Sequence, residues 1–341
     1  GRLDLRNRLI FTIDGESAKD LDDAVSLERD GAGRWVLGVH VAHVSHYVPA
    51  RSPLDEAAWE RGTSVYFADQ VIPMLPTQLS NGICSLNEGV DRLTLSCIMT
   101  LDAHGAVAEH TIVPSVIRSV RRMTYRRCNA LLAGAQPDGA REGEILPVLR
   151  DMAALSAVLE KARRLRGALE LESVESQILC DDAGRPVAVQ AHVQGESEKI
   201  IESFMLCANE CVAAHLEGLG KPAVYRVHER PSQDKVDKLR AMLAPLGFSL
   251  RQGDNFSLQK LLEEARDTPQ GPAVSNLVLR SMQKARYDTR SLGHFGLAAR
   301  YYCHFTSPIR RYPDLMVHRI LTALLGGGLE EGRAAGAPRR G

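Results

Sequence analysis

The chain has 341 residues, of which 44% are hydrophobic and 25% are charged, and this ordinary globular composition excludes wholesale disorder. At about 150 residues per domain the length suggests about two domains, although a single α/β unit also reaches this size. Lys and Arg total 42, as do Asp and Glu, so the formal net charge is zero. That balance argues against a histone-like protein held to nucleic acid by bulk charge, but it is compatible with a local basic channel.

Alternating apolar and β-branched residues predict strands in the first third of the chain. We expect them over 35–48 (WVLGVHVAHVSHYV), 93–101 and 106–117. Between the first two, the segment 72–76 contains two prolines, which block regular strand pairing, so irregular backbone is expected there.

After Pro147 the apolar period changes to that of a helix. Helices are expected over 149–165, 200–219, 234–246, 258–267, 276–287 and 312–325. Strands first and helices later predict an α+β fold, a β-rich first half packed against a helical second half, rather than alternating βαβ units.

Two segments have the composition of exposed chain. Residues 133–144 are rich in Gly, Ala, Asp and Glu and predict a surface loop, and residues 326–341 predict a flexible Gly/Ala/Arg-rich tail or linker. The sequence contains no internal repeat and no G-x-G-x-x-G or P-loop pattern, which weighs against enzymes that use a nucleotide cofactor.

The seven cysteines are scattered, and their one close pair, Cys207 and Cys211, has no second pair to complete a zinc site. We therefore expect free thiols in a reducing compartment. No apolar run approaches the ~20 residues that a membrane span needs, and no signal peptide is visible. A cytoplasmic monomer without a membrane partner is expected.

The most informative segment is 12–25 (TIDGESAKDLDDAV), in which four aspartates are bracketed by apolar residues. They are Asp14, Asp20, Asp22 and Asp23. Apolar anchors would hold the carboxylates close together on one loop, where each raises the pKa of its neighbours unless a cation neutralises them. Mg²⁺ is bound by such carboxylates together with phosphate oxygens and water, so we predict a metal site for phosphate chemistry. A structural acidic turn with N-cap duties is the alternative, whereas an EF-hand is excluded because its Gly and distal Glu are missing.

Cationic residues gather in two places. Tyr125 is surrounded by Arg118, Arg121, Arg122, Arg126 and Arg127. Arginine suits phosphate oxygens and a tyrosine offers a stacking face, but a solvated strand end with exposed arginines is the alternative.

The second cationic place is the segment 306–312 (TSPIRRY), which puts Arg310 and Arg311 at the entrance of the last predicted helix. Arginines are unfavourable there because the N-terminal end of a helix dipole is itself positive. Their presence in spite of this cost favours a role in binding an anion. For Glu202, near the start of the helix expected over 200–219, capping is the default interpretation. For His294, in a G-H-F-G motif, a buried hydrogen-bonded histidine is favoured over a base or ligand.

Together these motifs resemble the ribonuclease II / ribonuclease R exoribonucleases, and the chain is similar to their RNB catalytic domain. The matching segments are 12–25, 64–67 with 72–76, 123–125, 201–205, 225–229, 293–297 and 304–315. The resemblance covers roughly residues 5–325 and implies an RNB catalytic domain over 1–325 with a deep channel for single-stranded RNA. It also implies processive 3′→5′ hydrolysis that releases nucleoside 5′-monophosphates.

The resemblance assigns roles residue by residue. Asp14, Asp20 and Asp23 match metal-holding positions, and Asp22 matches both a metal position and the aspartate whose loss is most damaging. Arg310 matches the arginine that steadies charge on the scissile phosphate. Two Mg²⁺ ions, with Mn²⁺ as the alternative, and a two-metal mechanism are implied.

Five residues are RNA-binding candidates besides Arg310. Tyr66 matches an aromatic residue that stacks near the 3′ end, and Tyr125 and Glu202 match residues that recognise ribose, where the 2′-OH distinguishes RNA from DNA. Arg311 and His294 lie in the matched motifs and complete the set.

The sequence also departs from the family pattern. Leu171 stands where the family has a base-clamping aromatic, and His43 stands where it has an aspartate. Relatives carry RNA-binding cold-shock-type domains before the catalytic domain and an RNA-binding S1 domain after it. Neither lies in this sequence, and its first residue is Gly1. We therefore expect an excised catalytic domain. An RNA-binding pseudoenzyme, and a metal phosphatase or DNA exonuclease, are the rival functions.

Overall fold

The computed structural model describes residues 1–68, 70–171, 175–181 and 185–326, and every structural statement below refers to these residues. The strands are β1 (Leu3–Asp4), β2 (Thr12–Asp14), β3 (Asp23–Arg29), β4 (Trp35–Ala42), β5 (Val65–Tyr66), β6 (Val71–Ile72), β7 (Asp91–Leu101), β8 (Val107–Arg118), β9 (Arg122–Thr124), β10 (Glu175–Cys180), β11 (Pro186–His192), β12 (Tyr225–Val227) and β13 (Arg286–Asp288). The helices are α1 (Val44–Tyr47), α2 (Pro53–Arg61), α3 (Tyr125–Leu132), α4 (Gly139–Leu165), α5 (Glu196–Gly218), α6 (Gln233–Leu243), α7 (Asn255–Arg266), α8 (Gly271–Ser281) and α9 (Tyr312–Leu325), with a π-helical segment η1 (Gln78–Ile83) and a 3₁₀ turn η2 (Ala244–Leu246).

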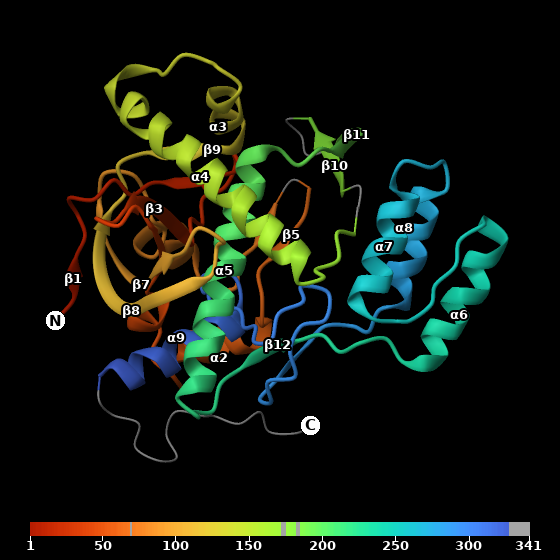
Figure 1. The fold of residues 1–341 in the computed structure, drawn as a ribbon. Coiled ribbons are helices and arrows are strands. Elements are labelled where there is room, and N and C mark those ends of the chain that lie inside the picture. Colours follow the sequence, from red (N-terminus) through yellow and green to blue (C-terminus); the bar gives the residue numbers. More distant parts are fainter. Residues whose placement is uncertain (69, 172–174, 182–184, 327–341) are drawn as a thin grey trace.

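The main sheet has the strand order β1-β8-β7-β4-β3, and hydrophobic clusters pack on both of its faces. Its neighbours are antiparallel except for the short parallel pair of β1 and β8. Because side chains alternate along a strand, Val39 and Val41 of β4 pack in a core with α3, α4 and α5, whereas Ala42 packs on the other face in a core with α1, α2 and α9. Figure 1 shows α4 and α5 lying across the sheet.

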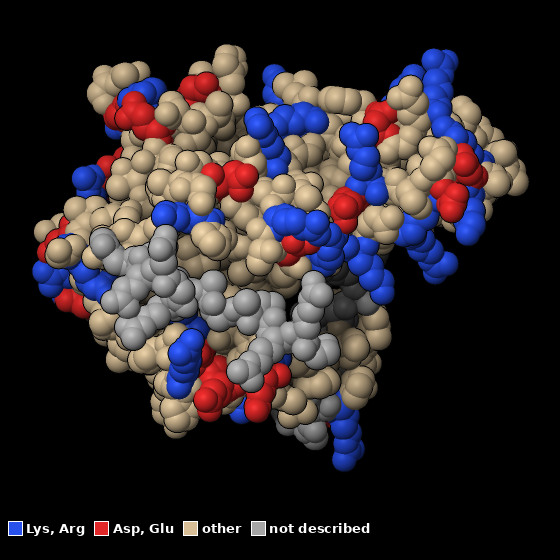
Figure 2. Space-filling view, turned by 90° about the horizontal axis from the view of Figure 1, so that it is seen from below, with Lys and Arg blue, Asp and Glu red and all other residues tan. Residues whose placement is uncertain are grey.

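A unit of three helices stands apart from the sheet. Helices α6, α7 and α8 enclose a hydrophobic cluster of their own, with Leu239, Leu261 and Val278 at its centre. In Figure 1 they form the far end of the molecule on the right. Figure 2 shows both charge signs over the face seen from below, with Lys and Arg most frequent toward this end. The neutral total therefore does not mean that charge is evenly spread.

Most of the expected elements are confirmed, and the fold class is α+β as predicted. The strands expected over 93–101 and 106–117 are β7 and β8, and the helix expected over 312–325 is α9. All seven cysteines are free thiols. Within the described part of the chain, no helix combines the length and apolarity needed to cross a membrane. Apart from Gly326, the predicted tail over 326–341 lies outside the described residues.

Three expectations about the chain were wrong. The strand expected over 35–48 ends at Ala42, because the chain turns there into α1. The loop expected over 133–144 instead begins α4 at Gly139, and this helix continues through Pro147. The helix expected over 276–287 ends at Ser281, and the last residues of that range enter β13, which pairs with β12.

A buried ion pair explains why α4 begins early. Glu142 is 3% exposed, and its carboxylate accepts hydrogen bonds from the Arg127 side chain and from the backbone N–H of Asp138. A proline inside a helix removes one backbone hydrogen bond. The hydrogen bonds from Arg127 and Asp138, which lie 15 and 4 positions before Glu142, stabilise this start of the helix, and composition alone does not reveal them.

A buried histidine makes the stability of the main sheet depend on pH. His40 is 2% exposed, and its ring nitrogens lie 3.0 Å from Ser26 Oγ and 2.7 Å from Ser96 Oγ. Burial lowers the pKa of His40 to about 3, whereas an unfolded histidine titrates near ~6.5. Between these values the unfolded chain binds more protons than the folded chain. The stabilisation is therefore fully present above about pH 6.5 and is lost as the pH falls toward 3.

We predict that the contribution of His40 to the free energy of unfolding in urea decreases as the pH falls below about 6.5, whereas the aspartates with raised pKa contribute in the opposite direction. His40→Gln keeps hydrogen-bonding capacity but cannot take up a proton, so it should be less stable at neutral pH and show a weaker pH dependence. His104→Gln, on an exposed turn, is the control and should retain the parent slope. Equal slopes for the parent and His40→Gln would contradict the prediction.

Candidate functional site

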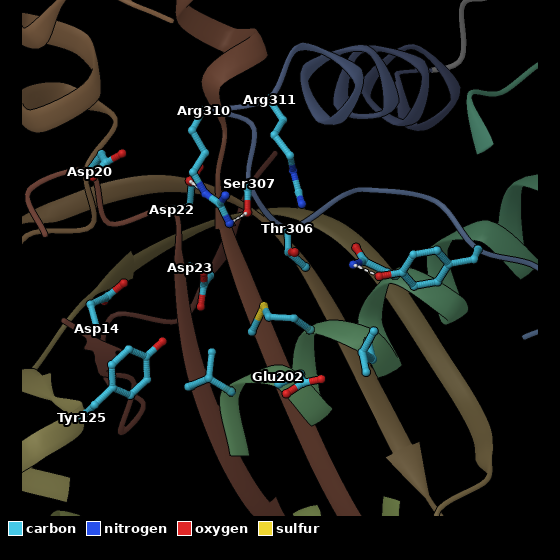
Figure 3. A pocket seen from close by; sticks show the side chains of 15 residues that line it. Asp14, Asp20, Asp22, Asp23, Tyr125, Glu202, Thr306, Ser307, Arg310 and Arg311 are labelled. Carbon is cyan, nitrogen blue, oxygen red and sulfur yellow. Dashed lines mark hydrogen bonds and ion pairs between the residues drawn. The ribbon is translucent and has the colours of Figure 1, made fainter. Parts of the chain in front are cut away.

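A cavity of about 250 Å³ opens where β2, β3, α3, α5 and the segment before α9 meet. Figure 3 shows its lining side chains pointing toward one another from these elements. They are Asp14, Asp20, Asp22, Asp23, Tyr125, Ile201, Glu202, Met205, Leu206, Asn209, Tyr302, Thr306, Ser307, Arg310 and Arg311. The cavity thus brings together eight of the ten residues singled out by sequence.

Apolar residues hold the four aspartates in place. Asp14 ends β2 and Asp23 begins β3, so both are fixed by strands. Leu21 in the loop between them and Ala24, the second residue of β3, are each 1% exposed and belong to the core shared with α9. The apolar residues that flank the aspartates in 12–25 are therefore buried and anchor the carboxylates, as the sequence predicts.

The aspartates lie in a poorly solvated place. Burial, with the charge of Asp23, raises the pKa of Asp14 to about 8. Burial also raises the pKa of Asp23 to about 6 against the opposing charges of Arg310 and Arg311, and it raises that of Asp22 well above its ordinary value. One oxygen of Asp14 and one of Asp22, each Oδ2, are buried without a hydrogen-bond partner in the protein. Unpartnered buried carboxylate oxygens are the donors that a hard divalent cation takes.

The carboxylates do not make a closed metal cage. Within the described residues, no three His, Cys, Asp or Glu side chains converge tightly enough to hold an ion by themselves. Mg²⁺ usually needs only one or two carboxylates, because water and substrate phosphate oxygens complete its shell. The donor set therefore fits an ion shared with a phosphate-bearing ligand and does not fit a structural metal.

The cationic wall consists of two arginines in different states. Arg311 donates two hydrogen bonds to Asp314, at 2.9 and 2.7 Å, and Asp314 is fully buried. Arg310 makes a looser ion pair, with its Nε 3.6 Å from Asp22 Oδ2, and donates to Ser307 Oγ at 3.0 Å. Arg310 is therefore the arginine freer to meet an anion.

Tyr125 and Glu202 reach the cavity from α3 and α5 (Figure 3). Burial and the charges of Asp23 and Asp14 raise the pKa of Tyr125, which places its hydroxyl beside the aspartates. Glu202 lies in the second turn of α5, which begins at Glu196, so the capping interpretation was wrong. Its carboxylate accepts a hydrogen bond from Gln194 and faces the cavity.

Tyr66 and His294 do not line the cavity. Tyr66 is half exposed on β5 and donates a hydrogen bond of 2.6 Å to Asp20, so it lies at the edge of the aspartate group. His294 lies behind the lining residue Tyr302, with its ring 5.2 Å from the tyrosine ring and 5.0 Å from that of His228. Burial lowers the pKa of His294 to about 4. These surroundings match the structural interpretation of His294.

The arginines around Tyr125 are occupied elsewhere. Four of them form ion pairs, Arg118 with Asp91, Arg121 with Glu88, Arg126 with Glu16 and Arg127 with Glu142. The fifth, Arg122, donates to backbone carbonyls of the loop that follows β2. These five residues therefore fit a solvated strand end with exposed arginines better than a phosphate-binding cluster.

Both departures from the family pattern have a structural context. Leu171 packs against the core of the three-helix unit. His43 is 2% exposed beside α1, with one ring nitrogen 2.9 Å from Arg2 Nη1 and the other 2.9 Å from Thr322 Oγ1 of α9. It lies outside the cavity lining and joins the chain start to α9.

Sequence reasoning missed Asn209. This side chain is 3% exposed and joins α5 to the segment that leads to Arg310. Its amide donates to the Tyr302 hydroxyl at 3.2 Å and its carbonyl accepts from Phe305 N at 2.9 Å. Asn209 follows Glu202 by seven positions, on the same helix face, and a polar residue at that spacing in an apolar helix was the available signal.

Comparisons with known proteins point in one direction. A family model described as RNB domain matches residues 2–327. The chain is 46% identical over 325 residues to Ribonuclease R 1 of Lactococcus lactis, an alignment that covers 94% of this chain and 40% of the relative. It is 48% identical over 330 residues to Ribonuclease R of Thermotoga maritima, covering 95% and 46%. The chain thus spans less than half the length of these curated relatives.

A solved structure extends the comparison. It is that of Mycoplasma genitalium RNase R in complex with ribose methylated single-stranded RNA. The two structures match with a TM-score of 0.92 at 32% identity, over 97% of this chain and 53% of that one. The family predicted from the motifs, and its fold, are confirmed.

We predict that Asn209→Leu lowers the free energy of unfolding by about 2–4 kcal/mol, because two buried polar groups lose their partner. Tyr302→Phe removes only the weaker hydrogen bond and should cost about 1 kcal/mol. Urea unfolding of both variants measures the difference. A loss in Asn209→Leu no larger than that in Tyr302→Phe would contradict a joining role for Asn209.

Proposed function

The chain belongs to the RNB domain family, and from this premise we propose that residues 1–325 form the catalytic domain of a 3′→5′ exoribonuclease that degrades single-stranded RNA. The observation that carries the proposal is the meeting of four aspartates, of which Asp22 is buried and the other three are half-buried, with Arg310 in one cavity. Near 46–48% identity to ribonucleases R supports it, as does the single-stranded RNA bound by the Mycoplasma genitalium relative. We place this activity in the cytoplasm and assign it to a monomer.

The aspartates supply negative charge beside the site of a scissile phosphate. Asp14, Asp20, Asp22 and Asp23 would hold Mg²⁺ or Mn²⁺, and two such ions, when bound, supply charge neutralisation and an activated water for phosphodiester hydrolysis. The unpartnered oxygens of Asp14 and Asp22 support this assignment, because buried carboxylates are costly without a cation or donor. Asp22 is further fixed by the backbone N–H of Ile309, which donates to its Oδ1 at 2.8 Å.

Arg310 acts on the phosphate directly. Its loose contact with Asp22 leaves guanidinium donors for the non-bridging oxygens of a phosphate in the cavity. Donors that are already in place where charge develops lower the barrier of the reaction. Arg311, held by Asp314, contributes a fixed positive charge on the same wall.

The pair Tyr125 and Glu202 selects ribose. A carboxylate that lines the cavity accepts a hydrogen bond from a 2′-OH, which DNA lacks. Tyr66 holds the terminal base: its hydroxyl is tied to Asp20, while its half-exposed ring offers a face for stacking. A strand held in this way advances after each cleavage, and the products are nucleoside 5′-monophosphates.

We predict that the protein releases 5′-monophosphates from single-stranded RNA in Mg²⁺ or Mn²⁺ and that EDTA stops the release. Asp22→Asn should lower the rate at least about 100-fold, equivalent to about 2.7 kcal/mol of barrier. Asp151→Asn, at an exposed position on α4, is the matched control and should leave the rate unchanged. RNA binding without hydrolysis by the parent protein would instead identify an RNA-binding pseudoenzyme.

We predict that the parent protein degrades an RNA oligomer far faster than the DNA oligomer of the same sequence. Glu202→Gln should reduce the RNA rate about tenfold or more and leave the slow DNA rate unchanged, because only RNA offers a 2′-OH. Glu160→Gln, on the exposed face of α4, is the control. Equal losses on RNA and DNA would contradict ribose recognition by Glu202.

A further inference from the structure

A second cavity, of about 280 Å³, lies on the other side of α5. Its walls are α4, α5 and the turn between β7 and β8. At 100° per residue, Cys207, Cys211 and Ala214 lie on nearly the opposite helix face from Glu202 and Asn209. The helix therefore separates this cavity from the candidate active site, and neither the proposed hydrolysis nor its metal ions use it.

Small side chains create the space. Gly105 forms the turn with a φ of +79°, and Ala162, Cys207 and Ala214 line the walls. The apolar surfaces of Val107 and Leu159 complete the lining near the turn. An apolar cavity of about 150 Å³ accepts benzene, so this one has room for a molecule about twice that size.

The cavity carries one uncompensated positive charge. Arg166 is neutralised by two hydrogen bonds to Glu210, at 2.9 and 3.0 Å. Arg163 also lines the cavity, but it donates only to a hydroxyl, Ser203 Oγ, at 3.0 Å. Across the parts of the chain that the structure describes, no acidic side chain lies within ion-pair distance of Arg163. The net charge of the lining is therefore positive.

The charge of Arg163 acts inside the cavity. Burial raises the pKa of the Cys207 thiol, and the positive charges of Arg163 and Arg166 oppose that rise. Both guanidinium groups are thus within electrostatic range of a thiol on the cavity wall. An apolar hollow with a cation of this kind suits a ligand that has an apolar body and one anionic group.

We propose that this cavity binds a small amphipathic carboxylate, with its carboxylate on Arg163 and its apolar body against Val107 and Leu159. A guanidinium pairs with a carboxylate through two parallel hydrogen bonds, and partial exclusion of water strengthens them. The site is independent of RNA, so it is tested without RNA or metal ions.

Octanoate is the probe, and 1-octanol, which has the same chain without the charge, is the comparison ligand. Methyl NMR distinguishes the two cavities, because Val107 lines the second cavity and Ile201 lines the candidate active site. We expect octanoate to shift the Val107 methyl signals saturably, to leave those of Ile201 in place, and to bind at least about tenfold more tightly than 1-octanol.

Adjacent arginines on α4 provide a matched pair of variants. Arg163→Ala should weaken octanoate binding about tenfold, whereas Arg164→Ala, which removes the same charge from an exposed position outside the lining, should leave it unchanged. Because Arg163 also bonds Ser203, Ala214→Leu serves as a second variant that blocks the cavity and keeps the arginine. Equal binding by the two arginine variants, undiminished binding to Ala214→Leu, shifts at Ile201 in place of Val107, or no saturable shift would each overturn the proposal.

Discussion

The hydrogen bond from the backbone N–H of Ile309 to the buried Asp22 carboxylate joins the two ends of the described chain at one point. It fixes the aspartate loop against the segment that carries Arg310, and the loose ion pair between Arg310 and Asp22 lies next to it. Leu21 and Ile309 belong to the same core, so apolar packing holds the polar contact in place. A misplaced segment would separate the acidic and basic halves of the cavity.

Many charged side chains among the described residues form ion pairs with neighbours in the fold. Four of the five arginines near Tyr125 are paired with acidic side chains, and Arg311 is paired with Asp314. At the candidate site the pairing is incomplete, since two aspartate oxygens lack partners and Arg310 lies 3.6 Å from its carboxylate. A neutral total thus conceals one place where opposite charges face a cavity without cancelling. Such a place attracts both cations and phosphates.

Sequence patterns predicted what depends on local order. The apolar residues of 12–25 predicted that the aspartates are anchored, and the helical spacing of apolar residues in 312–325 predicted the bounds of α9. Long-range contacts decided the rest. The early start of α4 depends on the ion pair of Glu142 with Arg127. The tertiary structure determines which side of α5 faces the cavity. Asn209 forms its hydrogen bonds with residues about a hundred positions away in the sequence. The arginines around Tyr125 were misjudged for the same reason, because their acidic partners come from other elements.

The hydrogen bond between Ile309 and Asp22 joins residues 287 positions apart in the sequence, and this separation affects when the site can form during synthesis. During synthesis the aspartates leave the ribosome well before Arg310, its Ser307 contact and α9. Contacts of such long range form only once the intervening chain has been made and folded. A growing chain therefore has an acidic loop but no complete cavity until the segment that carries Ser307, Arg310 and α9 has left the ribosome. Under the proposed function, the order of the sequence delays nuclease activity until translation of this region is finished.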